Sequence, residues 1–343
     1  TLFLGEWCKI YDQKNVWSCI EHEVLPYHWS NRERVYKDYL YLNEIYESLL
    51  PSLAEQMNKI HHRTHSVHYW RIVIGPWFYS FIQVLYDRYL SIKIAFESGK
   101  VTNTWIPNIE GYQFAPSDYK EFINNSYSDS YNQILYTQLI KSMKIFESET
   151  KHWPIEQSVK QKTRSLKYFS LKKIARNILE FYGKFIPNKL NEVVMVITHL
   201  SPWDLMRLQL KLGQLPYPAP PLVLSPKFKT NEKIRKKILL PKGENQFESL
   251  LSKLLGLHIP KAHLEEYSEM NRSSLAAFPR FPKTIFTANG LLFNEGFKLW
   301  VANQSEKGTK IIATQHGGHY GTGLWSSIET HEVKVSSRYI TWG

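Results

Sequence analysis

Two histidines lie in a glycine-rich stretch that follows a short strand-like run, residues 310–314. Histidine exchanges a proton readily near neutral pH, so His316 and His319 are candidate catalytic bases. Glycines at four of the seven positions 317–323 favour close approach of the backbone to a ligand and N–H donation to a phosphate. The alternative is a crossing loop whose histidines only satisfy backbone carbonyl groups. We expect a substrate site here, and its binding candidates are Gln315, Gly317, Gly318, Tyr320 and Gly321.

Two other strand-like runs end in weaker candidates. Glu6 and Trp7 follow residues 2–4, where a catalytic carboxylate would act on an acceptor and Trp7 would bind it. The alternative for Glu6 is an ordinary loop carboxylate. Asn289 follows the run that ends at residue 288, and it either binds substrate or makes the turn that Gly290 favours.

Residues 193–197 form a continuous apolar, β-branched run, which is typical of a strand buried on both faces of a parallel sheet. His199 follows this run as a further substrate-binding candidate. Ser201 and Pro202 then predict the start of a helix that runs through residue 212. Asp204 is either another substrate-binding residue or a carboxylate that favours the positive end of this helix.

The spacing of apolar residues predicts the elements that would position these candidates. The long helical segments are expected over 31–60, interrupted by Pro51; over 66–98, interrupted near Gly75 and Pro76; and over 119–147. A strand over 284–288, a helix over 291–306 and a strand over 310–314 predict a right-handed, parallel βαβ unit. Ligands of open α/β sheets bind at the carboxyl ends of strands, which is where the histidines lie. The fold class is therefore α/β.

Several short segments carry a resemblance that spans essentially the whole chain. They are Gly5-Glu6-Trp7-Cys8, Tyr27-His28-Trp29, Tyr69-Trp70-Arg71, Gly75-Pro76-Trp77, Gln315 to Gly321, and Ser337-Arg338-Tyr339 with Thr341-Trp342-Gly343. In combination they resemble one family, the transferases encoded in O-antigen and surface-polysaccharide gene clusters. Members of this family look like enzymes of the GT-B type, which have two Rossmann-like domains.

The resemblance implies a Rossmann-like parallel sheet with large helical insertions, the amino-terminal half of a two-domain GT-B-like enzyme. We accordingly expect one domain over residues 1–325, with insertions over about 25–185, and the start of a truncated carboxy-terminal domain over 326–343. The chain would be a fragment cut at both ends and inactive alone. The donor nucleotide would then lie mainly on the second domain, beyond Gly343.

The step from His316 to Gly317 is also similar, more distantly, to one in capsule sugar transferases and teichoic-acid glycerophosphotransferases. The matching histidine of those enzymes is taken to deprotonate the acceptor hydroxyl group. They continue with Thr-Pro-Leu-Lys, whereas this chain continues with Gly318-His319-Tyr320-Gly321. A nucleotide-activated sugar is therefore favoured over glycerol phosphate as the donated group. The resemblance implies a lipid-linked or polysaccharide acceptor and no cofactor, because the nucleotide sugar is a substrate.

A metal site is not favoured. His61, His65 and His68 share a helix face, but no glutamate completes a metalloprotease-like pattern and no cysteine is close in sequence. A polar helix surface is the favoured interpretation. No Asp-x-Asp motif follows a strand-like run, which favours metal-independent transfer.

The chain is basic, with 43 Lys and Arg against 31 Asp and Glu and a net charge of +12. The excess concentrates in two segments, 151–176 and 227–242, which are either ordinary solvated faces or surfaces for reversible contact with anionic membrane. No nucleic-acid motif accompanies them, so nucleic acid is not an expected partner. Binding to anionic vesicles would test the membrane hypothesis.

The expected location is the cytoplasm, with peripheral contact at the inner face of the cytoplasmic membrane. The first residues lack the features of a signal peptide, and no apolar run reaches the roughly 20 residues of a membrane span. Cys8 and Cys19 are the only cysteines and lack metal-type spacing, which favours a reducing compartment.

These observations favour a glycosyltransferase that extends a surface polysaccharide or O-antigen and uses a histidine base. Two alternatives remain open at the level of sequence. One is a nucleotide-sugar epimerase, which shares the two-domain architecture. The other is a non-catalytic basic scaffold that binds membrane or polysaccharide.

Overall fold

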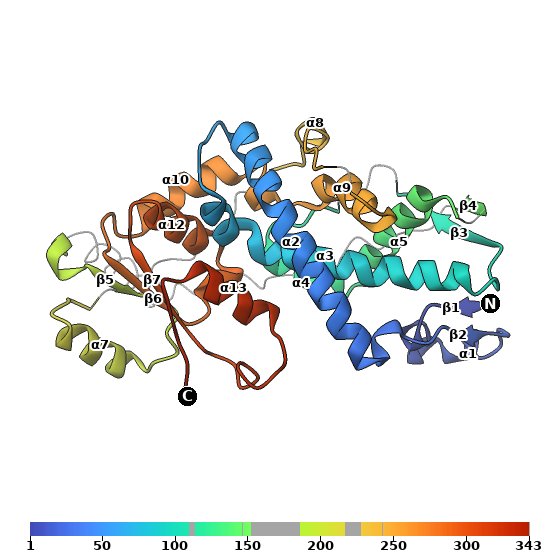
Figure 1. The fold of residues 1–343 in the computed structure, drawn as a ribbon, viewed down its shortest axis with the longest axis horizontal. Helices are drawn as coiled ribbons and strands as arrows, with labels where there is room; N and C mark the ends of the chain where they lie inside the picture. Colours follow the sequence, from blue (N-terminus) through green and yellow to red (C-terminus); the bar gives the residue numbers. More distant parts are fainter. Residues whose placement is uncertain (110–113, 146, 152–185, 217–227, 242, 343) are drawn as a thin grey trace, which may run out of the picture.

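The computed structural model describes the chain except for residues 110–113, 146, 152–185, 217–227, 242 and 343. The molecule is elongated, with a four-stranded sheet at one end, two small strand pairs at the other and long helices between them (Figure 1). A core of buried apolar side chains runs from the helices into the sheet. The fold is thus α/β, as the sequence predicts.

The four-stranded sheet is entirely parallel and has the order β5-β6-β7-β8. Its strands are β5 (Val193–Met195), β6 (Thr284–Thr287), β7 (Lys310–Thr314) and β8 (Arg338–Ile340). The domain boundary expected after residue 325 does not coincide with a break in this sheet. Instead α13 (Ser327–Val335) contacts β7 and β8, and β8 pairs with β7. Residues 327–340 therefore extend the same sheet.

The parallel βαβ unit is confirmed, but its helix is divided in two. The expected helix over 291–306 consists of α11 (Gly290–Phe293) and α12 (Glu295–Ser305). Asn294 separates them because its backbone is extended and its side chain accepts a hydrogen bond from the amide of Phe297, which caps α12. The chain then reaches β7 through a turn at Gly308 with a left-handed φ of 89°.

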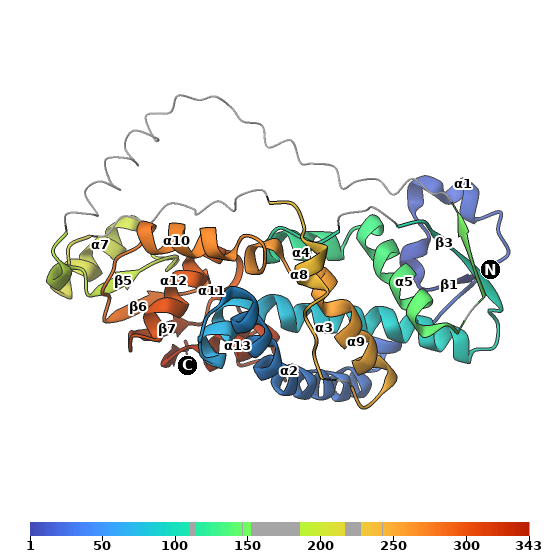
Figure 2. The same cartoon turned by 90° about the horizontal axis from the view of Figure 1, so that it is seen from above.

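The two long helices are α2 (Arg32–His61) and α3 (Val67–Glu97), and the interruptions expected in both are wrong. Pro51 lies inside α2 and Pro76 inside α3, where a proline costs about 3 kcal/mol relative to alanine. Packing outweighs this cost, because α3 contacts α2, α5, α12 and α13 and buries most of its side chains. At roughly 45 Å, α3 is long enough to connect the two ends of the molecule (Figure 2).

The end remote from the four-stranded sheet contains two parallel strand pairs. The pairs are β1 (Leu2–Phe3) with β2 (Glu23–Val24), and β3 (Asn103–Pro107) with β4 (Glu147–Lys151). The helix expected over 119–147 is divided into α4 (Tyr119–Ser126) and α5 (Asp129–Met143), and residues 147–151 form β4 instead. The helix stops at Lys144, which adopts a left-handed φ of 55°.

The remaining α-helices lie along the whole molecule, with α1 beside β1 and β2 at the end remote from the four-stranded sheet (Figure 1). They are α1 (Lys14–Trp17), α7 (Pro202–Lys211), α8 (Glu232–Arg235), α9 (Gln246–His258) and α10 (Tyr267–Ala277). In the part of the chain that the structure describes, no helix combines the length and apolar character needed to cross a membrane.

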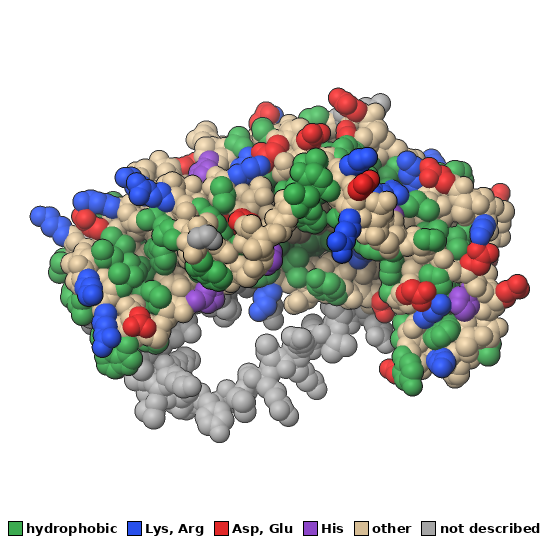
Figure 3. Space-filling model, turned by 60° about the horizontal axis from the view of Figure 1, so that its bottom comes forward, with side chains coloured by type: hydrophobic (Ala, Val, Ile, Leu, Met, Phe, Trp, Pro, Cys, Tyr) green, Lys and Arg blue, Asp and Glu red, His purple; other side chains and the backbone are tan. Residues whose placement is uncertain are grey.

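The expectation that the two basic segments are solvated faces is tested only in part of the second, where Lys229, Lys233, Lys236 and Lys237 are exposed as expected. Most of the first, over 151–176, lies outside the described residues. In the second, Arg235 is buried rather than solvated: it pairs with Glu265 at 2.7 Å and donates to three backbone carbonyls at the end of α9. Figure 3 shows Lys and Arg side chains spread among Asp and Glu over one face of the molecule. No single basic patch stands out on that face.

Candidate active site

The carboxyl edge of the four-stranded sheet brings together candidates from three strand ends. His199 follows β5, Asn289 follows β6, and Gln315 and His316 follow β7. Backbone hydrogen bonds join neighbouring strand ends. After β6, the amide of Ala288 donates to Ile197 O, which follows β5, at 3.0 Å. After β7, the amide of Gln315 donates to Ile340 O at the end of β8, at 2.8 Å. The rings of His199 and His316 lie 6.4 Å apart, centroid to centroid.

His316 is held by two side chains at the same ring nitrogen. Its Nε2 lies 2.8 Å from Glu332 Oε1 on α13 and 3.1 Å from the hydroxyl oxygen of Tyr320. Among the described residues, Nδ1 has no hydrogen-bond partner. A histidine whose one nitrogen is fixed by a carboxyl group and whose other nitrogen is free has the arrangement of an oriented general base.

Burial controls the charge of this pair. Glu332 is fully buried, and this burial raises the pKa of its carboxyl group to about 8; a hydrogen bond from Tyr339 opposes the rise and Glu329 adds to it. Burial, and then the neighbouring His199 and His319, lowers the pKa of His316. Both shifts favour the neutral forms of the two side chains, so the pair resists charge separation in the resting protein.

Gln315 holds the shape of the glycine-rich loop. Its side-chain amide donates to Gly317 O at 3.4 Å and to Tyr320 O at 3.2 Å, while its Oε1 accepts from the amide of Trp342 at 3.2 Å. Gly321 has a left-handed φ of 70°, which explains the need for glycine there. Gln315 is thus a structural organiser of the loop, beside its predicted role in binding.

The connection after β5 has unusual backbone geometry. Ile197 and His199 both have positive φ values, 53° and 59°. A β-branched residue in this region is a genuine outlier, and such strain is found most often at functional sites. His199 is exposed at this bend and its ring faces the edge that carries His316. The sequence carries no signal of this strain.

His319 and Asn289 differ in their surroundings from His316. His319 is exposed, and its ring contacts that of Tyr320 at 4.6 Å without joining the pair formed by His316 and Glu332. Asn289 is half-buried at the start of α11, where its side chain makes no capping hydrogen bond. Asn289 follows β6 at the same sheet edge as His199 and His316, and its binding role stays a prediction beside the turn that it makes before α11.

Asp204 lies in the first turn of α7 and contacts the residue that caps that helix. Ser201 caps the helix by accepting from the Asp204 amide at 3.1 Å, and its hydroxyl group donates to Asp204 Oδ2 at 2.6 Å. The predicted cap at Ser201 with Pro202 in the first turn is confirmed. The helix-start role suggested by the sequence therefore accounts for Asp204.

Replacing Asp204 with alanine is expected to lower the free energy of unfolding by about 0.5–1 kcal/mol, because a carboxylate favours the positive end of a helix. Ser201→Ala should cost about 1 kcal/mol through loss of the cap. Urea denaturation measures both changes. Catalysis should be unchanged in either variant, and a loss of turnover in Asp204→Ala alone would instead assign that carboxylate to substrate.

Glu6 and Trp7 are not part of this edge. They form a short 3-10 helix, Glu6–Cys8, directly after β1, at the end of the molecule remote from the sheet (Figure 1). Among the described strands β1 pairs with β2 alone, so the strand end that carries Glu6 belongs to a different sheet. Glu6 forms an exposed ion pair with Lys9 at 3.2 Å. A single site that combines Glu6 with His316 is therefore not formed.

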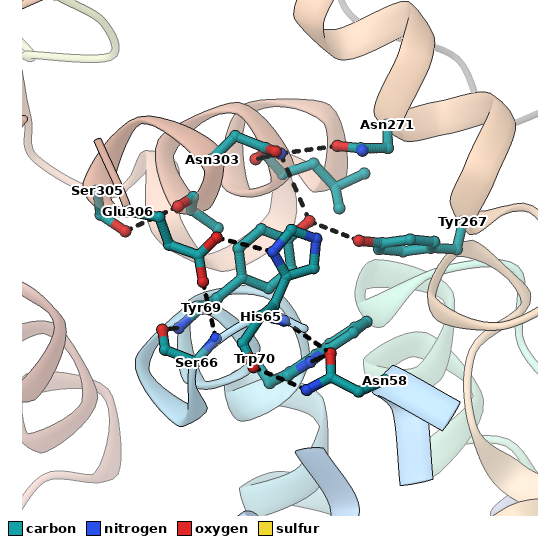
Figure 4. A network of polar contacts seen from close by, with 12 residues as sticks. Asn58, His65, Ser66, Tyr69, Trp70, Tyr267, Asn271, Asn303, Ser305 and Glu306 are labelled. Carbon is teal, nitrogen blue, oxygen red and sulfur yellow. Dashed lines mark hydrogen bonds and ion pairs between the residues drawn. The ribbon is translucent and has the colours of Figure 1, made fainter. Parts of the chain in front are cut away.

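His61 and His65, near the α2–α3 connection, have structural partners. Figure 4 shows His65 stacked over Tyr69, with its Nδ1 2.7 Å from Glu306 Oε2. His61 Nε2 lies 3.0 Å from the backbone oxygen of His263. In the described ranges, no group of three or more His, Cys, Asp or Glu side chains is placed to hold a metal ion. The network joins the start of α3 to the end of α12.

Sequence reasoning did not identify Glu332 as part of the site. It lies 16 positions after His316, on the helix that returns to β8, and its contact with the histidine depends on how that helix packs. The available signal is modest: Glu329 and Glu332 share a face of that helix at a spacing of three residues.

Comparison with known proteins identifies the class of the chain. A family model described as LIC12162 family transferase matches residues 1–343. No curated protein and no solved structure gives a significant match. The match covers the whole chain and specifies group transfer, without naming the group or the acceptor.

Proposed function

We propose that this chain, which belongs to the LIC12162 family of transferases, transfers a sugar from a nucleotide-activated donor to a growing surface polysaccharide or O-antigen. Family membership makes the protein a transferase; the sugar, the acceptor and the relation to GT-B enzymes are part of the proposal. The observation that supports it most is the oriented base at a sheet edge: His316 Nε2 lies 2.8 Å from Glu332 Oε1, and Nδ1 is left for a substrate.

In the proposed step, His316 activates an acceptor hydroxyl group. The hydroxyl oxygen attacks the anomeric carbon of the donor sugar and forms the new C–O bond, while its proton passes to Nδ1 of His316. The bond between the anomeric carbon and the phosphate oxygen breaks, and the nucleotide leaves with the bonding electrons as a phosphate. The histidine later returns the proton to solvent. Base catalysis of this kind contributes about 10²–10⁴-fold to a rate.

Glu332 acts through the histidine in this scheme and is a positioning residue. Its carboxylate form accepts a hydrogen bond from Nε2–H, which leaves the lone pair of Nδ1 facing the substrate and stabilises the imidazolium that forms. Backbone N–H groups of the loop at Gly317 and Gly318 are the candidates to bind the departing phosphate. Because the pKa of Glu332 is about 8, transfer should rise with pH up to that region.

Release of free nucleotide is the experiment that tests the proposal. The protein, in its natural full length, is incubated with a panel of nucleotide sugars with and without cell-envelope glycan as acceptor. Acceptor-dependent nucleotide release with sugar incorporation is the expected result. Interconversion of the nucleotide sugars without release would establish the epimerase instead, and binding of glycan or vesicles with neither reaction would establish the scaffold.

A further inference from the structure

A cavity of about 1300 Å³ lies at the end of the molecule remote from the four-stranded sheet and from the edge that carries His316. The N-terminal segment, the second half of α3 and the start of α5 enclose it. Its volume exceeds the roughly 300–1000 Å³ that is usual for a pocket that holds one small molecule. We call it the N-terminal cavity, and its principal wall residues are Gly5, Trp7, Tyr27, Asp87, Arg88 and Asn132.

The floor of the N-terminal cavity is a buried cluster whose charges compensate one another. Asp87 is only 3% exposed; it accepts a hydrogen bond from Tyr27 at 3.0 Å, lies 3.1 Å from His28 Nε2 and pairs with Arg88. The guanidinium of Arg88 also donates to Asn132 and to a backbone carbonyl. All three nitrogens of that guanidinium are therefore engaged, and little positive charge is left for an anionic ligand.

Two aromatic rings are exposed over this floor. Trp7 is 51% exposed and Tyr27 is 40% exposed, with their rings perpendicular and 5.9 Å apart. Gly5 is needed for this arrangement, since a Cβ atom there would lie 2.2 Å from the ring of Trp7. The exposed faces of these rings offer flat apolar surfaces at the cavity wall.

The polar groups at the rim select the ligand chemistry. The charged side chains that face the cavity beyond the Asp87 cluster are acidic, Glu6 and Asp129, which disfavours phosphate and nucleotide. Lys9 neutralises Glu6 at 3.2 Å, which disfavours a cation. The lining also includes exposed amides and hydroxyl groups, at Gln13, Ser30 and Gln133, and apolar side chains such as Ile10 and Val24. Aromatic surfaces among hydrogen-bonding groups suit a neutral, hydroxyl-rich molecule, namely a carbohydrate.

Aromatic residues near the start of α2 stack with the end of the glycine-rich loop. Trp325, at the end of the loop, stacks on Tyr39 of α2 at 4.6 Å, and Tyr39 stacks on Tyr36 at 6.3 Å. Gln83 of α3 donates to Ser327 at the start of α13, and Asp87 lies one helical turn further, about 6 Å along the axis. In Figure 1 the loop before α13 and the N-terminal segment lie along the same edge of the molecule, with the start of α2 between them.

We propose that the N-terminal cavity binds a neutral segment of the glycan acceptor, several sugars away from the hydroxyl group that reacts at His316. This inference rests on the proposed function and adds a subsite to it. The cavity holds the acceptor by ring stacking and hydrogen bonds, and the aromatic residues of α2 and the loop guide the chain toward the sheet edge. Longer acceptors then bind more tightly than short ones.

Calorimetric titration with neutral oligosaccharides of two to six sugars, in the absence of donor, tests the subsite directly. Wild-type protein should bind the longer members, and Trp7→Ala should weaken this binding by roughly tenfold, because one stacking surface is lost. Trp7→Phe keeps an aromatic face and should recover most of the affinity. Trp105→Ala is the matched control, since Trp105 is an exposed tryptophan on β3 that does not line the cavity. This variant should bind the oligosaccharides as tightly as the wild-type protein.

Gly5→Ala provides an independent variant that keeps the tryptophan but displaces its ring, and it should show the same loss. In transfer assays, Trp7→Ala should raise KM for long acceptors about tenfold and leave kcat and the KM of short acceptors unchanged. Unchanged oligosaccharide binding in Trp7→Ala and Gly5→Ala would overturn the subsite, as would binding of quaternary ammonium ions in place of sugars. Binding that depends on Trp7 in a protein without sugar transfer would support the subsite and contradict the proposed function alone.

Discussion

Transfer is expected to fall by about 10²–10⁴-fold when His316 is replaced by alanine, while the protein stays folded. The acceptor hydroxyl group is a poor nucleophile until a base removes its proton, and Nδ1 of His316 is the nitrogen that the described contacts leave for this role. His316 is partly exposed in the loop after β7, so the fold should tolerate alanine. Nucleotide release from the best donor, measured at saturating acceptor, gives the change in kcat.

His319→Ala is the matched control for this experiment. His319 lies three positions away in the same loop, is exposed, and contacts Tyr320 through its ring alone. Replacing His319 should reduce transfer by less than about tenfold, because no described carboxyl group orients its ring as a base. The small loss would come from disturbance of the loop. Equal losses in both variants would contradict a specific base role for His316, and full turnover in His316→Ala would remove it.

The sheet edge could be predicted from the sequence because it depends on local patterns. Apolar β-branched runs mark the strands, and the polar residue that follows each run marks its carboxyl end. In a parallel sheet those ends share one edge, so His199, Asn289 and His316 come together whatever their separation along the chain. The positions of these residues were therefore accessible before any coordinates.

Other features depend on tertiary packing and were not accessible in this way. The run at residues 2–4 resembles the other strands locally, yet it pairs with β2 in a separate sheet, which takes Glu6 and Trp7 away from His316. Pro76 predicts a break in the helix, yet α3 continues through it because the helix packs against its neighbours. The sequence around Glu332 is typical of a surface helix. The contact of α13 with β7 and β8 buries this carboxyl group beside His316.

Replacing Glu332 with glutamine is expected to stabilise the fold at pH 8 and above while lowering transfer. The pKa of Glu332 is about 8 in the folded protein, against an ordinary value of 4.5. The folded state therefore holds a proton that the unfolded state has released, and stability falls as pH rises from about 4.5 to about 8. The difference corresponds to at most about 5 kcal/mol, and glutamine, which cannot ionise, removes this loss.

The same substitution removes the carboxylate that orients His316 and stabilises its charged form. A glutamine amide that donates to Nε2 selects the tautomer with the proton on Nδ1, where the acceptor needs a lone pair, and such a change costs about 10²–10⁴-fold in rate.

Urea denaturation at pH 5 and pH 8.5, with nucleotide release on the same samples, measures both effects. Glu329→Gln is the control, since Glu329 accepts from the Gly321 amide and does not contact His316. A glutamine variant of Glu332 that loses stability equally at both pH values would show that the carboxyl group is a structural hydrogen-bond partner and does not tune the base. We expect Glu332→Gln to gain stability at pH 8.5 and to lose transfer. A purely structural role for the carboxyl group would not give both effects, whereas residues kept for catalysis are commonly destabilising.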